Sequence, residues 1–122
     1  MNYIRVYADP AGESHFEDVE VELSPVNFAP PAPPLDLSSF SPASQYAFCS
    51  FPAGWRGDWH RTPKRQFFFV LSGEATVQVS DGGVRHLGAG GVLLVEDTTG
   101  KGHLSWVMSK TDFLAVVVQL PD

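Results

Sequence analysis

Short apolar runs separated by turn-forming residues dominate the sequence, and no segment shows an amphipathic helical period. Successive side chains of a strand point to opposite faces, so short runs of alternating polarity indicate β-strands. In the later part of the chain we expect strands over residues 45–51, 66–71, 74–80, 84–87, 91–96, 103–108 and 113–120. Turns such as Asp81-Gly82-Gly83 separate neighbouring runs. Short strands at this spacing predict an all-β sandwich or barrel.

The N-terminal third has a different pattern. In residues 15–23, Val19, Val21 and Leu23 alternate with acidic residues, which predicts a half-buried strand with a charged outer face at a sheet edge. Residues 28–34 read FAPPAPP, a proline-rich segment that fits neither a helix nor a central strand. We interpret it as an extended arm that crosses the surface or reaches a neighbouring subunit. The alternative is a mobile linker.

Length and composition restrict the domain organisation and the partners. The 122 residues suit a single domain, with N-terminal strands and the arm in residues 1–44 and a barrel core in residues 45–120. A net charge of −6 argues against nucleic-acid and anionic-membrane partners. No apolar run approaches the roughly 20 residues that span a bilayer, and the N-terminus lacks the apolar stretch of a signal peptide. The single cysteine, Cys49, fits a reducing compartment, so we predict a soluble cytoplasmic protein.

One segment places two glycines and a histidine at regular spacings. Gly54 is followed after five residues by His60-x-Thr62, after three more by Gln66, and after six more by Gly73. This order resembles the first motif of the cupin family, which runs Gly, five residues, His-x-His, three or four residues, Glu, six residues, Gly. Every spacing is kept, but Thr62 stands at the second histidine and Gln66 at the glutamate.

A second segment resembles the other cupin motif, which runs Gly, five residues, Pro-x-Gly, two residues, His, three residues, Asn. Here Gly91 and five residues lead to Asp97 at the proline position, and His103 follows one residue late. The resemblance implies an antiparallel double-stranded β-helix, which is a jelly-roll barrel, and it implies a homodimer. The proline-rich arm and the edge strand give physical means for that dimer.

The two motifs predict a polar pocket. His60 and Thr62 share a strand face, as do Gln66 and Phe68, so a barrel brings two imidazoles and an amide together over an apolar floor. In the resembled family, three histidines and one glutamate usually hold a divalent metal. Here the candidate ligands are His60, Gln66 and His103, joined by Asp97 if its loop folds inward.

Two interpretations of these ligands stay open. One is a weakened site for a divalent metal such as Fe, Ni, Zn or Mn, since imidazole suits transition metals. The other is a set of hydrogen-bonded pocket residues that hold an organic ligand.

A basic patch surrounds the first motif although the protein is acidic overall. We expect ligand binding by Arg56, Thr62, Arg65, Phe68 and Lys101. Three of these side chains are cationic, so the predicted ligand is anionic.

Two functions are compatible with this site. The first is a cupin-like module that binds a small molecule without turning it over. The second is a metal-dependent enzyme of the dioxygenase, isomerase or lyase type acting on a small carboxylated metabolite, with His60 and His103 as ligands or proton carriers. Trp55 alternates off the His60 face and is expected in packing or dimer contacts. Cys49 lies in an apolar strand and is expected to be an inert thiol.

Overall fold

The computed structural model describes residues 1–122 and consists of strands and the loops that join them. The strands are β1 (Asn2–Ala8), β2 (Ser14–Glu20), β3 (Ser24–Val26), β4 (Leu35–Leu37), β5 (Gln45–Phe51), β6 (Gln66–Ser72), β7 (Ala75–Val79), β8 (Val84–Leu87), β9 (Val92–Val95), β10 (His103–Val107) and β11 (Phe113–Gln119). The prediction of an all-β chain is confirmed, and each run expected after residue 45 forms a strand. No helix of the structure combines the length and hydrophobicity that crossing a bilayer requires.

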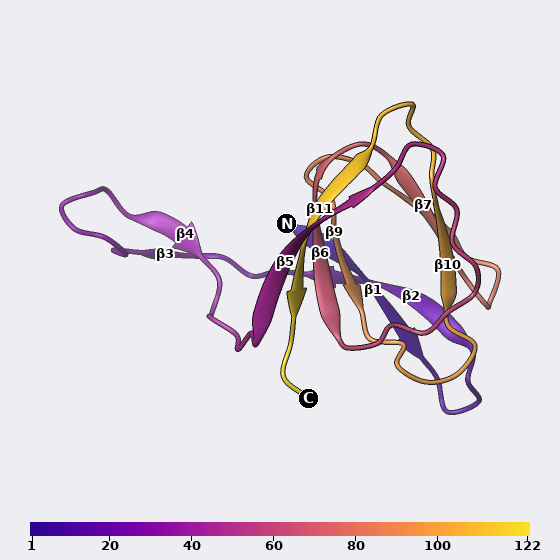
Figure 1. Cartoon of the computed structure of the whole chain (residues 1–122). Helices are drawn as coiled ribbons and strands as arrows, with labels where there is room; N and C mark the ends of the chain where they lie inside the picture. Colours follow the sequence, from indigo (N-terminus) through magenta and orange to yellow (C-terminus); the bar gives the residue numbers. More distant parts are fainter.

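Two sheets form the walls of a jelly-roll barrel (Figure 1). The larger sheet has six strands in the order β2-β1-β9-β6-β11-β5, and the smaller has three in the order β10-β7-β8. All pairings are antiparallel except that of β1 with β9, which joins Ile4 to Leu93 and Val6 to Val95. The core lies between the sheets and is built mainly from aliphatic side chains, including Val6, Val70, Val77, Val79, Val95 and Ala115.

The N-terminal strands depart from the expectation in two ways. Strand β2 lies at a sheet edge as predicted, but it ends at Glu20, so Val21 and Leu23 lie beyond it. Its inward side chains are Ser14 and Phe16, which occupy the same alternating face as the exposed Asp18 and Glu20. The face that is acidic at the end of the strand is therefore packed against the core at its start. Strand β1 also belongs to the six-stranded sheet, so the barrel uses residues 2–20 in addition to the later strands.

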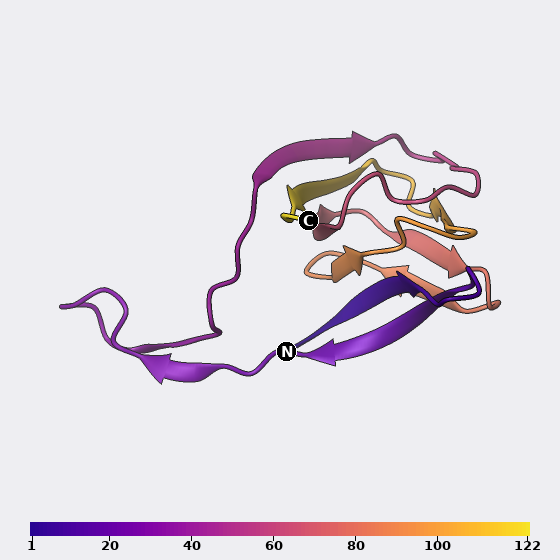
Figure 2. The same cartoon turned by 90° about the horizontal axis from the view of Figure 1, so that it is seen from below.

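The projecting arm is longer than the proline-rich segment, and from here on the name denotes residues 22–43, between β2 and β5 (Figure 2). Strands β3 and β4 form a small antiparallel hairpin in which Ser24 pairs with Leu37 and Val26 with Leu35. Figures 1 and 2 show this hairpin projecting away from the two sheets, joined to β2 on one side and β5 on the other. The two strands pair with no other strand. A short isolated hairpin is at best marginally stable in water, so the arm has no packed core of its own.

Candidate functional site

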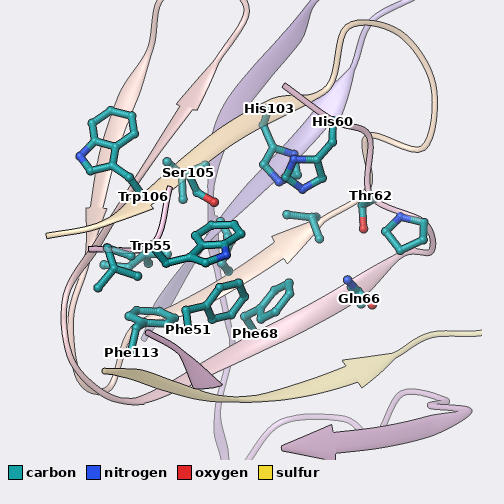
Figure 3. Close-up of a pocket in the computed structure, with 17 residues that line it drawn as sticks. Phe51, Trp55, His60, Thr62, Gln66, Phe68, His103, Ser105, Trp106 and Phe113 are labelled. Atoms are coloured by element: carbon teal, nitrogen blue, oxygen red, sulfur yellow. The ribbon is translucent and has the colours of Figure 1, made fainter. Parts of the chain in front are cut away.

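A cavity of about 100 Å³ opens between the two sheets. Its floor is aromatic, with Phe51, Trp55, Phe68 and Phe113 gathered around it (Figure 3). The ring of Phe51 meets that of Trp55 edge to face at a centroid distance of 4.8 Å and that of Phe113 at 5.8 Å. Such pairs prefer tilted geometry, which keeps these rings in fixed positions. The polar lining is grouped apart from this floor and consists of His60, Thr62, Gln66, His103 and Ser105.

The two histidines lie side by side because their backbones form a β-bridge. The amide N of His60 donates to the carbonyl O of His103 at 2.9 Å, and the amide N of His103 donates to the carbonyl O of His60 at 2.9 Å. Residues paired in this way present their side chains on the same face. The ring centroids are 4.6 Å apart, and both rings point toward the cavity in Figure 3. His103 is buried, whereas His60 is exposed to solvent.

Gly102 makes this close approach possible. Its φ is +76°, a conformation that residues with a Cβ rarely adopt. A Cβ at this position would overlap the carbonyl group of His60. Glycine is therefore required where the loop before β10 passes the segment that carries His60.

Each histidine uses one ring nitrogen within the protein. Nδ1 of His60 lies 2.8 Å from the carbonyl O of Asp58, and a carbonyl only accepts, so this nitrogen carries the proton. Nδ1 of His103 lies 2.6 Å from Oδ2 of Asp97 and donates to that carboxylate. In the neutral form of both rings, Nε2 is therefore an unprotonated acceptor available to the cavity.

Asp97 lies behind His103 and does not line the cavity. Its side chain is fully buried, and Oδ1 has no hydrogen-bond partner. The loop does turn the Asp97 carboxylate inward, which was the condition for Asp97 to join the ligands, but it places the carboxylate on the His103 imidazole and outside the cavity lining. An oriented carboxylate fixes the tautomer and the direction of a histidine ring, and His103 is held in this way.

Gln66 and Thr62 line the same cavity and are also tied to the protein. Nε2 of Gln119 donates to Oε1 of Gln66 at 3.0 Å, which leaves the Gln66 amide N–H groups for a ligand. Nε2 of Gln45 donates to Oε1 of Gln119 at 2.5 Å, so a row of three amides crosses the end of the six-stranded sheet. The hydroxyl of Thr62 donates to the carbonyl O of Lys64 at 2.6 Å.

The cations predicted to hold an anionic ligand are not brought to the cavity. The guanidinium of Arg56 stacks over Trp106 at 4.9 Å from the ring centroid. The Lys101 ammonium pairs with Glu13. Nε of Arg65 lies 2.6 Å from Oε2 of Glu96.

Glu96 is the shared partner of two cations. Its other oxygen, Oε1, accepts a hydrogen bond from Nε of Arg5 at 2.5 Å. Burial raises the pKa of Glu96, but hydrogen bonds from Arg5 and Arg65 outweigh it and lower the pKa overall. These partners come from distant segments of the chain, which a local basic cluster does not reveal. Of the five predicted ligand-binding residues, only Thr62 and Phe68 line the cavity.

Aromatic residues form more of the cavity wall than the sequence predicts. Trp55 packs against Phe51 as expected, but it also forms part of the cavity wall. Phe51 and Phe113 line the cavity from the ends of two paired strands. The signal that could have found them is their position on the inward face of β5 and β11. Cys49 is half-buried, and burial raises the pKa of its thiol, which makes it a poor nucleophile.

The donor set does not fit a resident divalent metal. The family that the two motifs resemble usually holds one, yet no three His, Cys, Asp or Glu side chains of this chain are grouped to ligate an ion. Asp97 is engaged by His103, and Gln66 offers a neutral amide whose oxygen already accepts from Gln119. Two imidazoles without an anionic ligand provide little to offset the charge of a dication.

The fold and the cavity define a small single-barrel protein with one ligand-sized interior site. The family described as "Cupin domain" matches residues 47–118, which is more than half of the chain. This chain belongs to the cupin family.

Several solved structures resemble the chain at low identity. A cupin domain from Bordetella pertussis is 14% identical, with 85% of this chain and 98% of that chain covered and a TM-score of 0.48. The cupin domain of Cnp3 from Schizosaccharomyces pombe is 13% identical, covering 98% and 88%, with a TM-score of 0.48. A putative ethanolamine utilization protein from Salmonella typhimurium is 15% identical, covering 99% and 96%, with a TM-score of 0.43. No curated protein matches the sequence.

Proposed function

We propose that this cupin domain binds one small, mostly apolar organic molecule inside its barrel. The observation that carries the proposal is the cavity itself, which has an aromatic floor and a separate polar group of side chains. Ligand sites commonly combine an apolar lining with a few placed polar groups. The volume of about 100 Å³ is below the roughly 150 Å³ of an apolar cavity that holds benzene, so it limits the ligand to about one ring.

The chemistry of the lining favours a neutral ligand over the anionic one expected from the basic patch. No lysine or arginine lines the cavity. A bound carboxylate would lose its hydration without gaining a permanent cation, and burial of an unpaired charge is costly.

A titration with benzene and toluene tests the proposal. We expect binding that shifts the Trp55 indole N–H signal in NMR spectra. Phe68→Ala should change the affinity because this ring lines the cavity, whereas Phe67→Ala is the matched control on the other face of the same strand. If neither compound binds, or if both variants act alike, the cavity is not a ligand site of this kind.

A second candidate function is a proton-transfer enzyme acting on a similar small molecule. One observation favours it: the buried carboxylate of Asp97 orients His103, whose ring lines the cavity. A carboxylate-oriented imidazole is a common arrangement for a general base. This function predicts that the wild type exchanges solvent deuterium into a bound ketone and that Asp97→Asn does not. Ligand binding without any exchange would support the binding module alone.

We also propose that two copies of the chain form a dimer by exchanging arms. Large apolar side chains are exposed along the arm at Leu23, Val26, Phe28, Leu35 and Phe40. A second exposed apolar group covers the outer face of the six-stranded sheet at Tyr46, Phe48, Phe69, Leu71 and Leu114. Apolar patches of this kind are typical of interaction surfaces.

The two groups fit a reciprocal contact. The arm leads directly into β5, which is the edge strand that carries Tyr46 and Phe48. An arm that has no core of its own and a bare sheet face on the same chain can cover each other across a two-fold axis. The second copy is therefore the partner proposed for this face.

We also propose a cytoplasmic location. Its support is Cys49, the only cysteine, which carries a free thiol. Proteins of reducing compartments keep their thiols in this form. Cell fractionation that finds the protein outside the cytoplasm would contradict it.

A further inference from the structure

The hydrogen bonds of the two histidines restrict which ligands the cavity accepts. We infer that the cavity selects neutral ring compounds carrying a hydroxyl or N–H donor, which they give to Nε2 of His60 or His103. The inference rests on the proposed binding function and names the ligand class. It is carried by the protein partners of the two rings together with the absence of a cation in the cavity lining.

In each histidine ring, the protein occupies one nitrogen and leaves the other free. Nδ1 of His60 faces the Asp58 carbonyl, and Nδ1 of His103 faces the Asp97 carboxylate. Both partners are acceptors, so the Nδ1 atoms are donors and the Nε2 atoms of the neutral rings are acceptors. The two rings that carry these acceptors have centroids 4.6 Å apart, and both line the cavity. A ligand that brings only acceptors, such as an ether or a carboxylate, meets lone pairs there.

The orientation of the His103 ring is held by the buried side chain of Asp97. Asp97 is fully buried and its Oδ1 has no partner, so the site retains a costly carboxylate that serves His103 alone. An unsatisfied buried acceptor is unfavourable, and its presence is explained if the orientation of His103 matters. Asp97 is therefore a positioning residue that keeps Nε2 of His103 directed to the ligand.

The rest of the cavity lining restricts the shape and the second polar contact of the ligand. The floor of Phe51, Trp55, Phe68 and Phe113 favours a flat apolar body, and the cavity volume limits it to about one ring. Gln66 presents only its amide N–H to the cavity, since its oxygen accepts from Gln119. A hydroxyl group can donate to an imidazole and also accept from an amide, so phenols and small cyclic alcohols are the best match.

Phenol, anisole and benzoate are the probes that test this inference on the wild-type protein. They share one ring and differ in having a donor, a capped oxygen and a charged acceptor. We expect titration calorimetry to show phenol binding about 3- to 10-fold more tightly than anisole, as the loss of one hydrogen bond predicts, and benzoate binding more weakly than phenol. Equal affinities for phenol and anisole, or tighter binding of benzoate, would overturn the inference while leaving the proposed binding function intact. Failure of all three to bind would overturn both.

Two variants connect the selectivity to the histidines. His60→Phe removes an acceptor from an exposed position and should reduce the preference for phenol over anisole. His86→Phe is the control, because His86 is also exposed and hydrogen-bonds Thr76 outside the cavity. If His60→Phe keeps the full preference for phenol over anisole, Nε2 of His60 is not the acceptor and only Nε2 of His103 can be.

An NMR measurement tests the role of His103 without replacing this buried ring. Imidazole ¹⁵N spectra of the wild type should show His103 protonated at Nδ1, and Asp97→Asn should disturb that signal. A His103 ring protonated only at Nε2 in the wild type would refute the inference.

Discussion

Replacing Gly102 by alanine should be among the most damaging single-methyl changes in this protein. The residue is buried, has φ +76°, and lies against the His60 carbonyl across the bridge that pairs the two histidines. Left-handed backbone costs a residue with a Cβ about 1–2 kcal/mol. Forcing the His60 backbone away adds about 1–3 kcal/mol of overpacking. The total loss in the free energy of unfolding is therefore about 2–5 kcal/mol.

Gly82→Ala is the matched control for this change. Gly82 has φ +95°, but it lies in an exposed turn where a Cβ would meet no atom within 4 Å. Only the backbone cost of about 1–2 kcal/mol applies there. Urea unfolding followed by tryptophan fluorescence measures both variants, and the Gly102 variant should have a midpoint roughly 1 M below that of the Gly82 variant. Equal midpoints would show that the segment carrying His60 yields freely and would refute the argument for a tightly fixed histidine pair.

Three further predictions concern titration, assembly and metal content. Hydrogen bonds to Asp9 and Asp81 raise the pKa of His15, so its protonated ring stabilises the fold below about pH 6.5 and this contribution is lost as the pH rises through the raised value. The urea midpoint of the wild type should exceed that of His15→Gln by more at about pH 6 than at about pH 9, and a gap independent of pH would contradict this. Sedimentation at micromolar concentration should show a dimer that Phe48→Asp dissociates and Val84→Asp leaves intact, whereas a monomeric wild type would end the arm-exchange proposal. Untagged protein should contain clearly less than one divalent metal per chain by mass spectrometry, and a stoichiometric metal lost in His60→Ala would overturn our interpretation of the donor set.

The later strands could be predicted from the sequence because each carries its own signal. Strand β6 alternates Gln66, Phe68 and Val70 toward the interior, and glycine turns bound most of its neighbours. The expectation for β2 was wrong in its inward residues, because the face that carries the acidic Asp18 and Glu20 at the exposed end of the strand carries Ser14 and Phe16 against the core at its start. Pairings between distant segments, such as β1 with β9, leave no local trace in either strand.

The candidate site was predictable in its polar members and not in its electrostatics. The resemblance to the two motifs identified His60 and Gln66 at kept spacings and His103 one residue late, and all three line the cavity. The position of Asp97 could not be predicted, because a loop of this composition can turn its carboxylate toward either side of His103. The same holds for Lys101, whose partner Glu13 belongs to the opposite end of the chain.

The parallel pairing of β1 with β9 has a consequence for how the chain folds. The hairpin of β1 and β2 precedes the strand that completes its inner edge, Val92–Val95, by about 70 residues of chain, so it is synthesised well before that strand. Until then the inner edge of β1 has no partner within the chain. Contacts this distant in sequence slow folding, because a long loop must close before they form. We expect millisecond-to-second refolding, with the unpaired inner edge of β1 open to non-native strand pairing until β9 docks.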